Sequence, residues 1–388
     1  MFSRHRLTRR HYILMALTIG LGGQLAGGWL LVRLLLPGWG SAAVPAAMGF
    51  CAVMTLPLVL RLRIGLPGET GMLGATLYGY YFWWAMALYA GLAAPVCFFL
   101  ARCVGASDRI AATAALGCGF WAGIGGLTYR RMRARLRRIE LAIPGWPRAL
   151  DGYRIAQLSD IHMGPHTPPK RVRRWVDLIN TLTPDLVAVT GDLVASGNHF
   201  IEAVAEELGR LRGRDGVVLC MGNHDYMCDH VRLVAALERA GIEVLRNCGR
   251  VVERSGACYW LGGVDDTWRN RHDVARSVKG RAPGVATVIL AHDPILFEEC
   301  AAHGASLVLS GHTHGGQLAI PIFSRLLNPA SLSYRYTAGW YELGSAQLYV
   351  SRGAGTTGPP LRIGSPSEIV LVTLRSAEIR PAGQPILK

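Results

Sequence analysis

The chain has 388 residues, which is long for one domain and suggests two or more, since about 150 residues per domain is typical. Its net charge of +15 is unevenly spread: residues 1–150 hold 16 arginines, no lysine and 3 acidic residues, whereas residues 151–388 hold 25 basic and 23 acidic residues. A balance of +2 in the C-terminal part lacks the basic footprint of a nucleic-acid-binding domain, so we expect no nucleic-acid partner.

Four long apolar stretches fill the N-terminal part of the chain, at residues 12–36, 41–60, 72–100 and 110–129. Each reaches the length of about 20 residues that a helix needs to cross the hydrocarbon core of a bilayer. None shows the polar face of a helix in a soluble core, and Arg33 lies near the end of its stretch, where its side chain can reach the headgroups. We therefore predict a multi-span region of about four transmembrane helices within residues 1–140.

Arginines outside these stretches predict their orientation, because cytoplasmic loops are enriched in Lys and Arg. Positive charge precedes the first stretch and separates the second from the third, at Arg4, Arg6, Arg9, Arg10, Arg61 and Arg63. With an even number of spans, this pattern places both termini and the C-terminal part in the cytoplasm. Residues 8–14 compete with this interpretation, because they resemble a twin-arginine export signal that would place the C-terminal part outside.

Six further arginines follow the fourth stretch, at Arg130, Arg131, Arg133, Arg135, Arg137 and Arg138. A solvated helix face would explain them, but their place directly after a span favours contact with anionic lipid headgroups. Pro144, Gly145, Pro147 and Gly152 then predict a linker at residues 141–152, followed by a second domain at residues 153–380.

This second domain alternates strand and helix signals, which indicates an α/β fold. Residues 170–182 and 201–211 place apolar side chains on one face at helical spacing, so we predict helices there. Short apolar runs around Gly-containing turns predict two hairpins, at residues 250–261 and 340–350. A second sheet, packed against the first, would contain these hairpins.

Five apolar runs in this domain end in residues that can bind a metal ion. These residues are Asp160, His162, Asp192, Asn223, His292, His312 and His314. Because ligands bind beyond the carboxyl ends of strands in such sheets, side chains spread over about 155 positions can converge. His312 and His314 are two residues apart, and in an extended segment such residues point to the same side.

The mixture of carboxylate, imidazole and amide ligands suits first-row ions such as Mn, Fe or Zn. Seven ligands exceed what one ion usually takes from a protein, so we expect two divalent ions bridged by one carboxylate. Two dications and two ionised aspartates leave a net charge of +2, which matches an anionic phosphate ester. Such a pair clamps the attacking and leaving oxygens and acidifies a bridging water to hydroxide.

His224 lies among these residues but is not needed as a ligand, so it can serve the leaving group. We expect the neighbouring Asp225 to orient its ring, and protonated His224 to donate to the phosphoryl oxygen or the departing alkoxide. Arg352, in a Gly-rich segment, is a candidate for binding the substrate phosphate. Trp268 and Trp340 fit packing better than substrate contact.

Together these residues resemble the five sequence blocks of the calcineurin-like metallophosphoesterase superfamily, in the order of that superfamily. The blocks are Asp160 with His162, Gly191 with Asp192, Gly222 through Asp225, His292, and Gly311 with His312 and His314. Residues 311–317, 351–355 and 366–369 resemble its membrane-associated, YkuE-type bacterial branch. The resemblance, over residues 150–375, implies an α/β calcineurin-like phosphoesterase fold of two mixed β-sheets packed between helices.

The resemblance also assigns roles to individual positions. It implies that Asp160, His162 and His314 hold a first ion. A second ion would be held by Asn223, His292 and His312, with Asp192 bridging and His224 as the catalytic histidine. A bacterial inner (plasma) membrane is the expected location.

The leading hypothesis is a membrane-anchored, dinuclear metal-dependent phosphoesterase that hydrolyses phosphate mono- or diesters, including phospholipid or other lipid-linked ones, by attack of metal-bound hydroxide. The alternative is a membrane transporter or sensor whose metal domain is a regulatory binding module, but the spans carry almost no ionisable residues. A nuclease would use the same metals, and the balance of +2 weighs against it. The oligomeric state is left open by the sequence.

Overall fold

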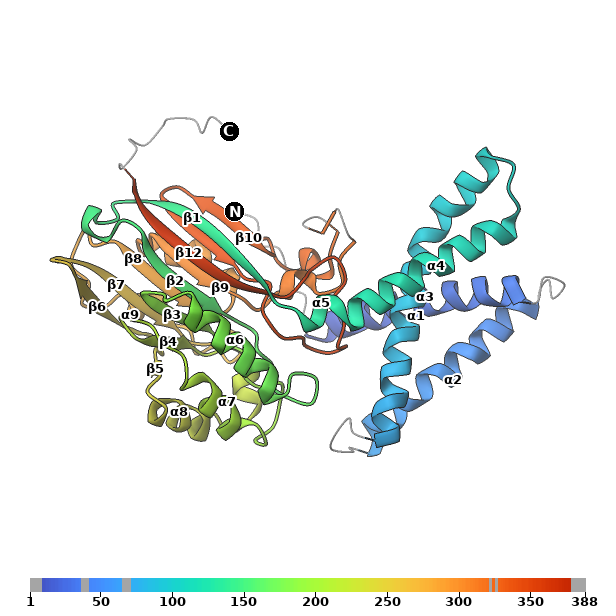
Figure 1. The fold of residues 1–388 in the computed structure, drawn as a ribbon, viewed down its shortest axis with the longest axis horizontal. Coiled ribbons are helices and arrows are strands. Elements are labelled where there is room, and N and C mark those ends of the chain that lie inside the picture. The colour runs from blue at the N-terminus through green and yellow to red at the C-terminus, as the bar shows by residue number, and fades with distance from the viewer. Residues whose placement is uncertain (1–8, 36–41, 65–70, 321–322, 325–326, 378–388) are drawn as a thin grey trace. The chain divides into compact units, whose positions relative to one another are not determined.

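A computed structural model describes the chain apart from residues 1–8, 36–41, 65–70, 321–322, 325–326 and 378–388. Arg4 and Arg6, which bear on the predicted orientation, therefore lie outside the described residues. The chain divides into two compact units (Figure 1). One unit comprises Met1–Met132 with Pro359–Ile363, and the other Arg133–Gly358 with Gly364–Lys388.

The N-terminal unit is helical, and its long helices coincide with the four predicted apolar stretches. They are α1 (Arg9–Leu35), α2 (Ala43–Ile64), α3 (Gly71–Cys103) and α4 (Asp108–Leu127), followed by the short α5 (Tyr129–Met132). Two segments of the described chain, Thr76–Cys103 and Asp108–Leu127, are long and apolar enough to cross a membrane. The apolar parts described in α1 and α2 are shorter, so the prediction of four spans is not confirmed.

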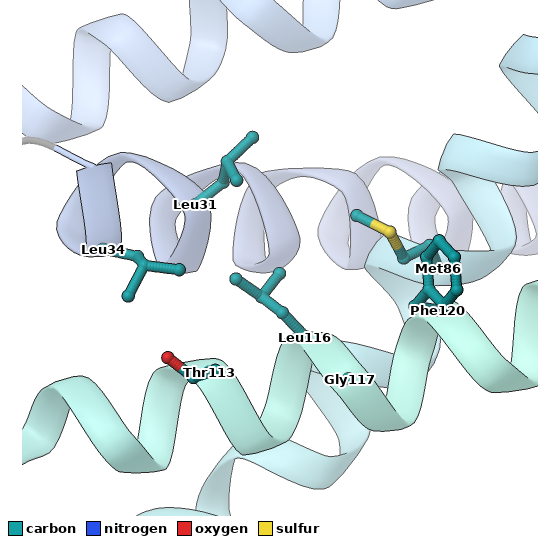
Figure 2. A pocket seen from close by; sticks show the side chains of 7 residues that line it. All are labelled: Leu31, Leu34, Met86, Thr113, Leu116, Gly117 and Phe120. Atoms are coloured by element: carbon teal, nitrogen blue, oxygen red, sulfur yellow. The ribbon is translucent and has the colours of Figure 1, made fainter.

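An open apolar groove of about 300 Å³ lies in this helical unit (Figure 2). Its lining comes from α1, α3 and α4, through Leu31, Leu34, Met86, Thr113, Leu116, Gly117 and Phe120. The hydroxyl of Thr113 donates to the carbonyl oxygen of Arg109 at 2.8 Å, within its own helix. The lining therefore offers apolar packing and no group suited to acid–base or metal chemistry.

The C-terminal unit contains two six-stranded mixed sheets, as expected from the resemblance. The strands of the first sheet, in spatial order, are β1 (Arg135–Pro144), β12 (Glu368–Ala377), β2 (Tyr153–Leu158), β3 (Leu186–Thr190), β4 (Val217–Cys220) and β5 (Glu243–Val244). Those of the second are β10 (Gly339–Leu343), β11 (Ala346–Val350), β9 (Leu307–Ser310), β8 (Thr287–Ala291), β7 (Ala257–Val264) and β6 (Cys248–Arg254). The two predicted hairpins are confirmed as the antiparallel pairs β6–β7 and β10–β11 of the second sheet.

The two sheets pack face to face, and helices cover their outer sides. Side chains such as Ile155 and Ala188 of the first sheet share a buried core with Leu261 and Leu290 of the second. Helices α6 (Pro169–Thr181), α7 (Ile201–Leu208) and α8 (His230–Arg239) lie along the first sheet (Figure 1). The apolar faces predicted for α6 and α7 are buried there. Because both faces are covered, strands such as β3 and β4 are apolar along nearly their whole length.

The start of this unit differs from the predicted linker at residues 141–152. Strand β1 pairs in parallel with β12 over ten residues, from Arg135 with Glu368 to Pro144 with Ala377. After β1, the buried ring of Trp146 packs 5.0 Å from that of Tyr259, measured between centroids. The outward-facing arginines of this edge strand gave it the composition of a juxtamembrane segment. In the arginine cluster, Arg130 and Arg131 accordingly lie in α5, Arg133 lies between the two elements, and the other three arginines lie in β1.

Candidate metal centre

The predicted ligands follow five strands that come from both sheets. Strands β2, β3 and β4 of the first sheet lead to Asp160 and His162, to Asp192 and to Asn223, and strands β8 and β9 of the second lead to His292 and to His312 with His314. Within the described chain, these side chains form three groups that could each hold a metal ion, because the ligand atoms of each group lie within 4.8 Å of one another. These groups are Asp160 with His162 and His314, then Asp192 with His292 and His312, and finally His162 with Asp192 and His224. The last group joins the first two.

The backbone at these positions adopts an unusual conformation. Asp160, His162, Asp192, His312 and His314 all have positive φ angles, between 46° and 70°. Such angles are uncommon for residues other than glycine, and they persist at functional sites because the surrounding structure enforces them. His312 and His314 are thus carried by a tight turn and not by an extended segment. As a consequence, they belong to two different ligand groups and do not face one common point.

Backbone hydrogen bonds join the strand ends to each other. The N–H of Asp160 donates to the carbonyl oxygen of Gly191 at 3.0 Å, and the N–H of His162 donates to that of Asp192 at 2.9 Å. Gly191 has φ +75°, and a Cβ there would lie 2.6 Å from the backbone N of Gly222 and 2.8 Å from Nδ1 of His292. The glycine before Asp192 is therefore required both by its conformation and by the close approach of two other strand ends.

Carbonyl oxygens fix the orientation of two imidazole rings. Nδ1 of His292 lies 2.7 Å from the carbonyl oxygen of Thr190, and Nδ1 of His224 lies 2.7 Å from that of Ala195. A carbonyl oxygen can only accept, so each Nδ1 carries a proton. Each Nε2 is then available to a ligand or substrate. Nε2 of His292 lies 3.3 Å from Oδ2 of Asp192.

The packing of donor atoms suits bound cations. Nε2 of His162 and Nε2 of His314 face each other at 3.0 Å, and Nε2 of His314 is 3.4 Å from Oδ1 of Asp160. The side-chain oxygen of Asn223 is buried, and it has no hydrogen-bond partner among the residues that the structure describes. Leaving a buried amide oxygen unsatisfied is costly, and a cation would satisfy it. The residues present therefore fit divalent ions.

The charged groups of the centre shift one another's pKa values. Burial by itself raises the pKa of the Asp192 carboxyl, but His292, His224 and His162 outweigh it and hold that pKa well below its usual value. Burial by itself lowers the pKa of the His292 imidazole, but the negative charge of Asp192 outweighs burial. The pKa of His292 is therefore raised well above its usual value. Asp192 is therefore anionic, which is the state in which a carboxylate can bridge two cations.

Asp225 has other partners than the predicted one. Its two oxygens accept the backbone N–H groups of Gly222 at 2.9 Å, Asp192 at 3.0 Å and Leu193 at 2.7 Å. Burial, followed by the negative charge of Asp192, raises the pKa of this carboxyl to about 7. The ring of His224 is held by the carbonyl oxygen of Ala195, so the structure contradicts the expectation that Asp225 orients it. Asp225 instead fixes the turns that carry Asp192 and Asn223.

Arg352 is paired within the protein. Its Nη1 lies 3.0 Å from Oε2 of Glu368, its backbone N–H donates to Oε1 of the same residue at 2.9 Å, and its side chain is largely buried. Binding of the substrate phosphate by Arg352 stays a prediction.

Two aromatic side chains beside His312 were not anticipated as site residues. The hydroxyl of Tyr334 lies 2.7 Å from Nε2 of His312, and the ring of Trp268 lies 5.6 Å from that of His312, between centroids. Both residues lie in loops, Trp268 in the loop after β7 and Tyr334 in the loop before β10. No sequence motif surrounds them, which is why the pattern of strand ends could not identify them.

Comparisons with known proteins agree with this geometry. Residues 153–316 match the family described as calcineurin-like phosphoesterase. The chain is 34% identical over 254 residues to a "Transmembrane protein with metallophosphoesterase domain" of Danio rerio, covering 62% of this chain and 57% of that protein. It is 30% identical over 234 residues to the "Uncharacterized metallophosphoesterase YkuE" of Bacillus subtilis, covering 59% of this chain and 82% of that protein.

A third relative, an "Uncharacterized metallophosphoesterase" of Aquifex aeolicus, is 31% identical over 229 residues, covering 57% of this chain and 85% of that protein. The chain thus spans little more than half of the length of the Danio rerio relative but most of the two bacterial ones. The chain belongs to the calcineurin-like phosphoesterase family.

Proposed function

We propose that this chain is a membrane-anchored, metal-dependent phosphoesterase that hydrolyses phosphate mono- or diesters at a pair of divalent ions. One observation carries the proposal: two groups of ligand atoms, Asp160 with His162 and His314, and Asp192 with His292 and His312, lie side by side and are linked through Asp192 and His162. A site of this kind suits an anionic substrate, because the positive charge of two divalent ions exceeds the negative charge of the two aspartates.

The ligands divide between the two ions as follows. Asp160, His162 and His314 hold the first, and Asn223, His292 and His312 hold the second. Asp192 is shared, and the donor set suits Mn, Fe or Zn. When bound, such a pair polarises the phosphoryl group and activates water for in-line displacement.

His224 can transfer a proton at the edge of this centre. Its backbone N–H donates to Oδ1 of Asp192 at 2.8 Å, which holds the residue against the shared carboxylate. Its Nδ1 is occupied by the carbonyl oxygen of Ala195, so Nε2 is the atom that can donate to a departing oxygen. Ala195 and Asp192 thus contribute to the orientation of His224.

Anchoring in the membrane is supported by the apolar segments of α3 and α4 and by the name of the Danio rerio relative. We extend the proposal to about four spans in a bacterial inner membrane, with the catalytic unit in the cytoplasm. A tethered site would lie near headgroups, so lipid-linked phosphoesters are included among the substrates.

The test uses the full-length chain in detergent, stripped with a chelator and reloaded with Mn, Fe or Zn. Hydrolysis of 4-nitrophenyl phosphate and bis(4-nitrophenyl) phosphate is compared for the wild type, His224→Ala and the control His199→Ala. His199 is exposed and lies outside the ligand groups. We expect metal-dependent hydrolysis that falls about a hundredfold or more in His224→Ala and is unchanged in His199→Ala.

Two results would change the proposal. Bound metal without hydrolysis of either ester, or of a phospholipid in vesicles, would favour a regulatory binding module attached to a membrane transporter or sensor. Hydrolysis of the soluble esters without any hydrolysis of lipid phosphoesters would remove the lipid substrates and leave the phosphoesterase.

A further inference from the structure

A large aromatic side chain is exposed beside the candidate metal centre. The side chain of Trp268 is 50% exposed, although its ring contacts that of His312 at a centroid distance of 5.6 Å and an interplanar angle of 72°. His312 belongs to the ligand group that also contains Asp192 and His292. Isolated exposed apolar side chains are common on protein surfaces, but this one adjoins a ligand.

Buried polar contacts hold the loop that presents Trp268. The hydroxyl of Thr267 donates to Oδ2 of Asp293 at 2.6 Å, and Asp293 directly follows His292 in the sequence. Oδ2 of Asp266 accepts the backbone N–H of Arg269 at 2.9 Å. The side chains of Thr267, Asp266 and Asp293 are all buried. Thr267 thus ties the loop to the strand end that carries His292, and Asp266 closes the turn around Trp268, so the segment that presents the indole has a defined position beside the site.

A second aromatic side chain beside His312 is that of Tyr334. Tyr334, whose hydroxyl contacts His312, follows the turn η6 (Pro329–Leu332), and Leu332 at the end of this turn is 57% exposed. The turn η6 packs against η5 (His314–Gly316), which begins at the other histidine of the pair. His312 is therefore in contact with two aromatic side chains, those of Trp268 and Tyr334.

We infer that Trp268 binds the organic group of the substrate, and that this group carries an aromatic ring, whether the ester is soluble or lipid-linked. The inference rests on the proposed function and deepens it. A phosphoryl group held at Asp192, His292 and His312 must direct its ester substituent away from the ligands. An indole beside His312 offers that substituent a flat apolar surface, and aromatic rings pack on such surfaces more favourably than small alkyl groups do. Trp268 is then a specificity-determining residue.

The test measures binding without turnover. Phenylphosphonate and methylphosphonate carry the same anionic group on a carbon that cannot be released as an alcohol, and they differ in the aromatic ring. Their dissociation constants are measured by calorimetry on the Mn-loaded full-length chain, for the wild type, Trp268→Ala, Trp268→Phe and Trp340→Ala. Trp340 is a matched control, because it is 39% exposed on β10 and its Nε1 donates to Oε1 of Gln347 instead of adjoining the centre.

We expect the wild type to prefer phenylphosphonate and Trp268→Ala to lose about tenfold in affinity for it, with methylphosphonate binding unchanged. Trp268→Phe should keep most of the preference, which also controls for loss of folding, and Trp340→Ala should keep all of it. Equal binding of both phosphonates by the wild type, binding of neither, or an unchanged preference in Trp268→Ala would overturn the inference.

A hydrolysis experiment separates this inference from the proposed function. The kcat/KM ratio for phenyl phosphate over methyl phosphate should fall in Trp268→Ala through the KM for the phenyl ester. A wild type that hydrolyses both esters, with the same ratio in Trp268→Ala, contradicts the inference and leaves the phosphoesterase standing. A wild type that hydrolyses neither, but binds phenylphosphonate through Trp268, contradicts the proposed activity and leaves the inference standing.

Discussion

The carboxylate of Asp160 accepts the backbone N–H of His312, with 3.0 Å between the nitrogen and Oδ1. Asp160 follows β2 of the first sheet and His312 follows β9 of the second, 152 residues later. The same carboxylate accepts the hydroxyl of Ser159 at 2.5 Å. One predicted ligand thus positions the backbone of another, and the geometry of the centre depends on how the two sheets pack.

Replacing Gly311 by alanine should disrupt this contact. A Cβ at this position would overlap Oγ of Ser159 and Oδ2 of Asp160, both of which are buried. Relieving the overlap must move Asp160 or the turn at His312, so we expect Gly311→Ala to weaken Mn binding by at least about tenfold and to cost about 1–3 kcal/mol of stability. Calorimetric titration of the stripped protein measures the affinity. Gly125→Ala is the control, because a Cβ there meets no atom within 4 Å; equal Mn binding by the wild type and Gly311→Ala would contradict this account.

Asp225→Asn should destabilise the protein without removing a ligand. The carboxylate accepts three backbone N–H groups, whereas an amide offers one oxygen and turns an NH₂ group toward the remaining donors. We expect the free energy of unfolding to fall by about 2–3 kcal/mol, as measured by denaturant unfolding in detergent. Asp229→Asn is the matched control, because Asp229 caps α8 and asparagine caps helices equally well. A comparable loss in both variants would show that Asp225 has no special structural role.

Tyr334→Phe should weaken the binding of one of the two ions and leave the affinity for the other unchanged. The hydroxyl of Tyr334 fixes Nε2 of His312 and leaves Nδ1 facing the group with Asp192 and His292. Removing such a partner of a metal-binding histidine typically lowers metal affinity by about tenfold or more. Tyr336→Phe, which removes a hydroxyl that contacts Glu298, should leave both affinities unchanged. Two ions bound with wild-type affinities in Tyr334→Phe would rule out this role.

The position of the domain boundary can be tested by truncation. A chain that begins at Arg133 keeps β1 and Trp146, and we expect it to be soluble and cooperatively folded. A chain that begins at Tyr153 lacks both, exposes the edge of β12 and opens the aromatic cluster around Tyr259. Solubility and the near-ultraviolet circular dichroism of the two chains measure the difference. Equal behaviour would support the linker predicted at residues 141–152.

Much of this site could be predicted from the sequence because strand ends follow a simple rule. An apolar run followed by Asp192 or by His292 indicates both the strand and the place where its ligand emerges. The division of the strands between two sheets was not visible, because β8 and β9 are as apolar as β2 and β3. The positive φ angles of His312 and His314 were also hidden, since they arise from tertiary contacts.

Other features could not be predicted because neighbours in sequence are not always neighbours in space. Asp225 follows His224 directly, yet its oxygens lie on the backbone of Asp192 and Leu193, more than thirty residues earlier. Trp268 reaches His312 from a loop with no periodic pattern. Strand β1, by contrast, did carry a signal: Leu141 and Ile143 alternate with outward residues, but the surrounding arginines outweighed it.

The number of ions bound per chain tests the central claim most directly. Full-length protein reloaded with Mn and freed of excess metal is analysed by plasma mass spectrometry, for the wild type, His314→Ala and Asp192→Ala. We expect about two ions in the wild type, about one in His314→Ala, which removes a ligand of one group, and fewer than one in Asp192→Ala, which removes the shared carboxylate. A wild type that binds one ion or none, or an Asp192→Ala variant that still binds two, would contradict the two-ion centre.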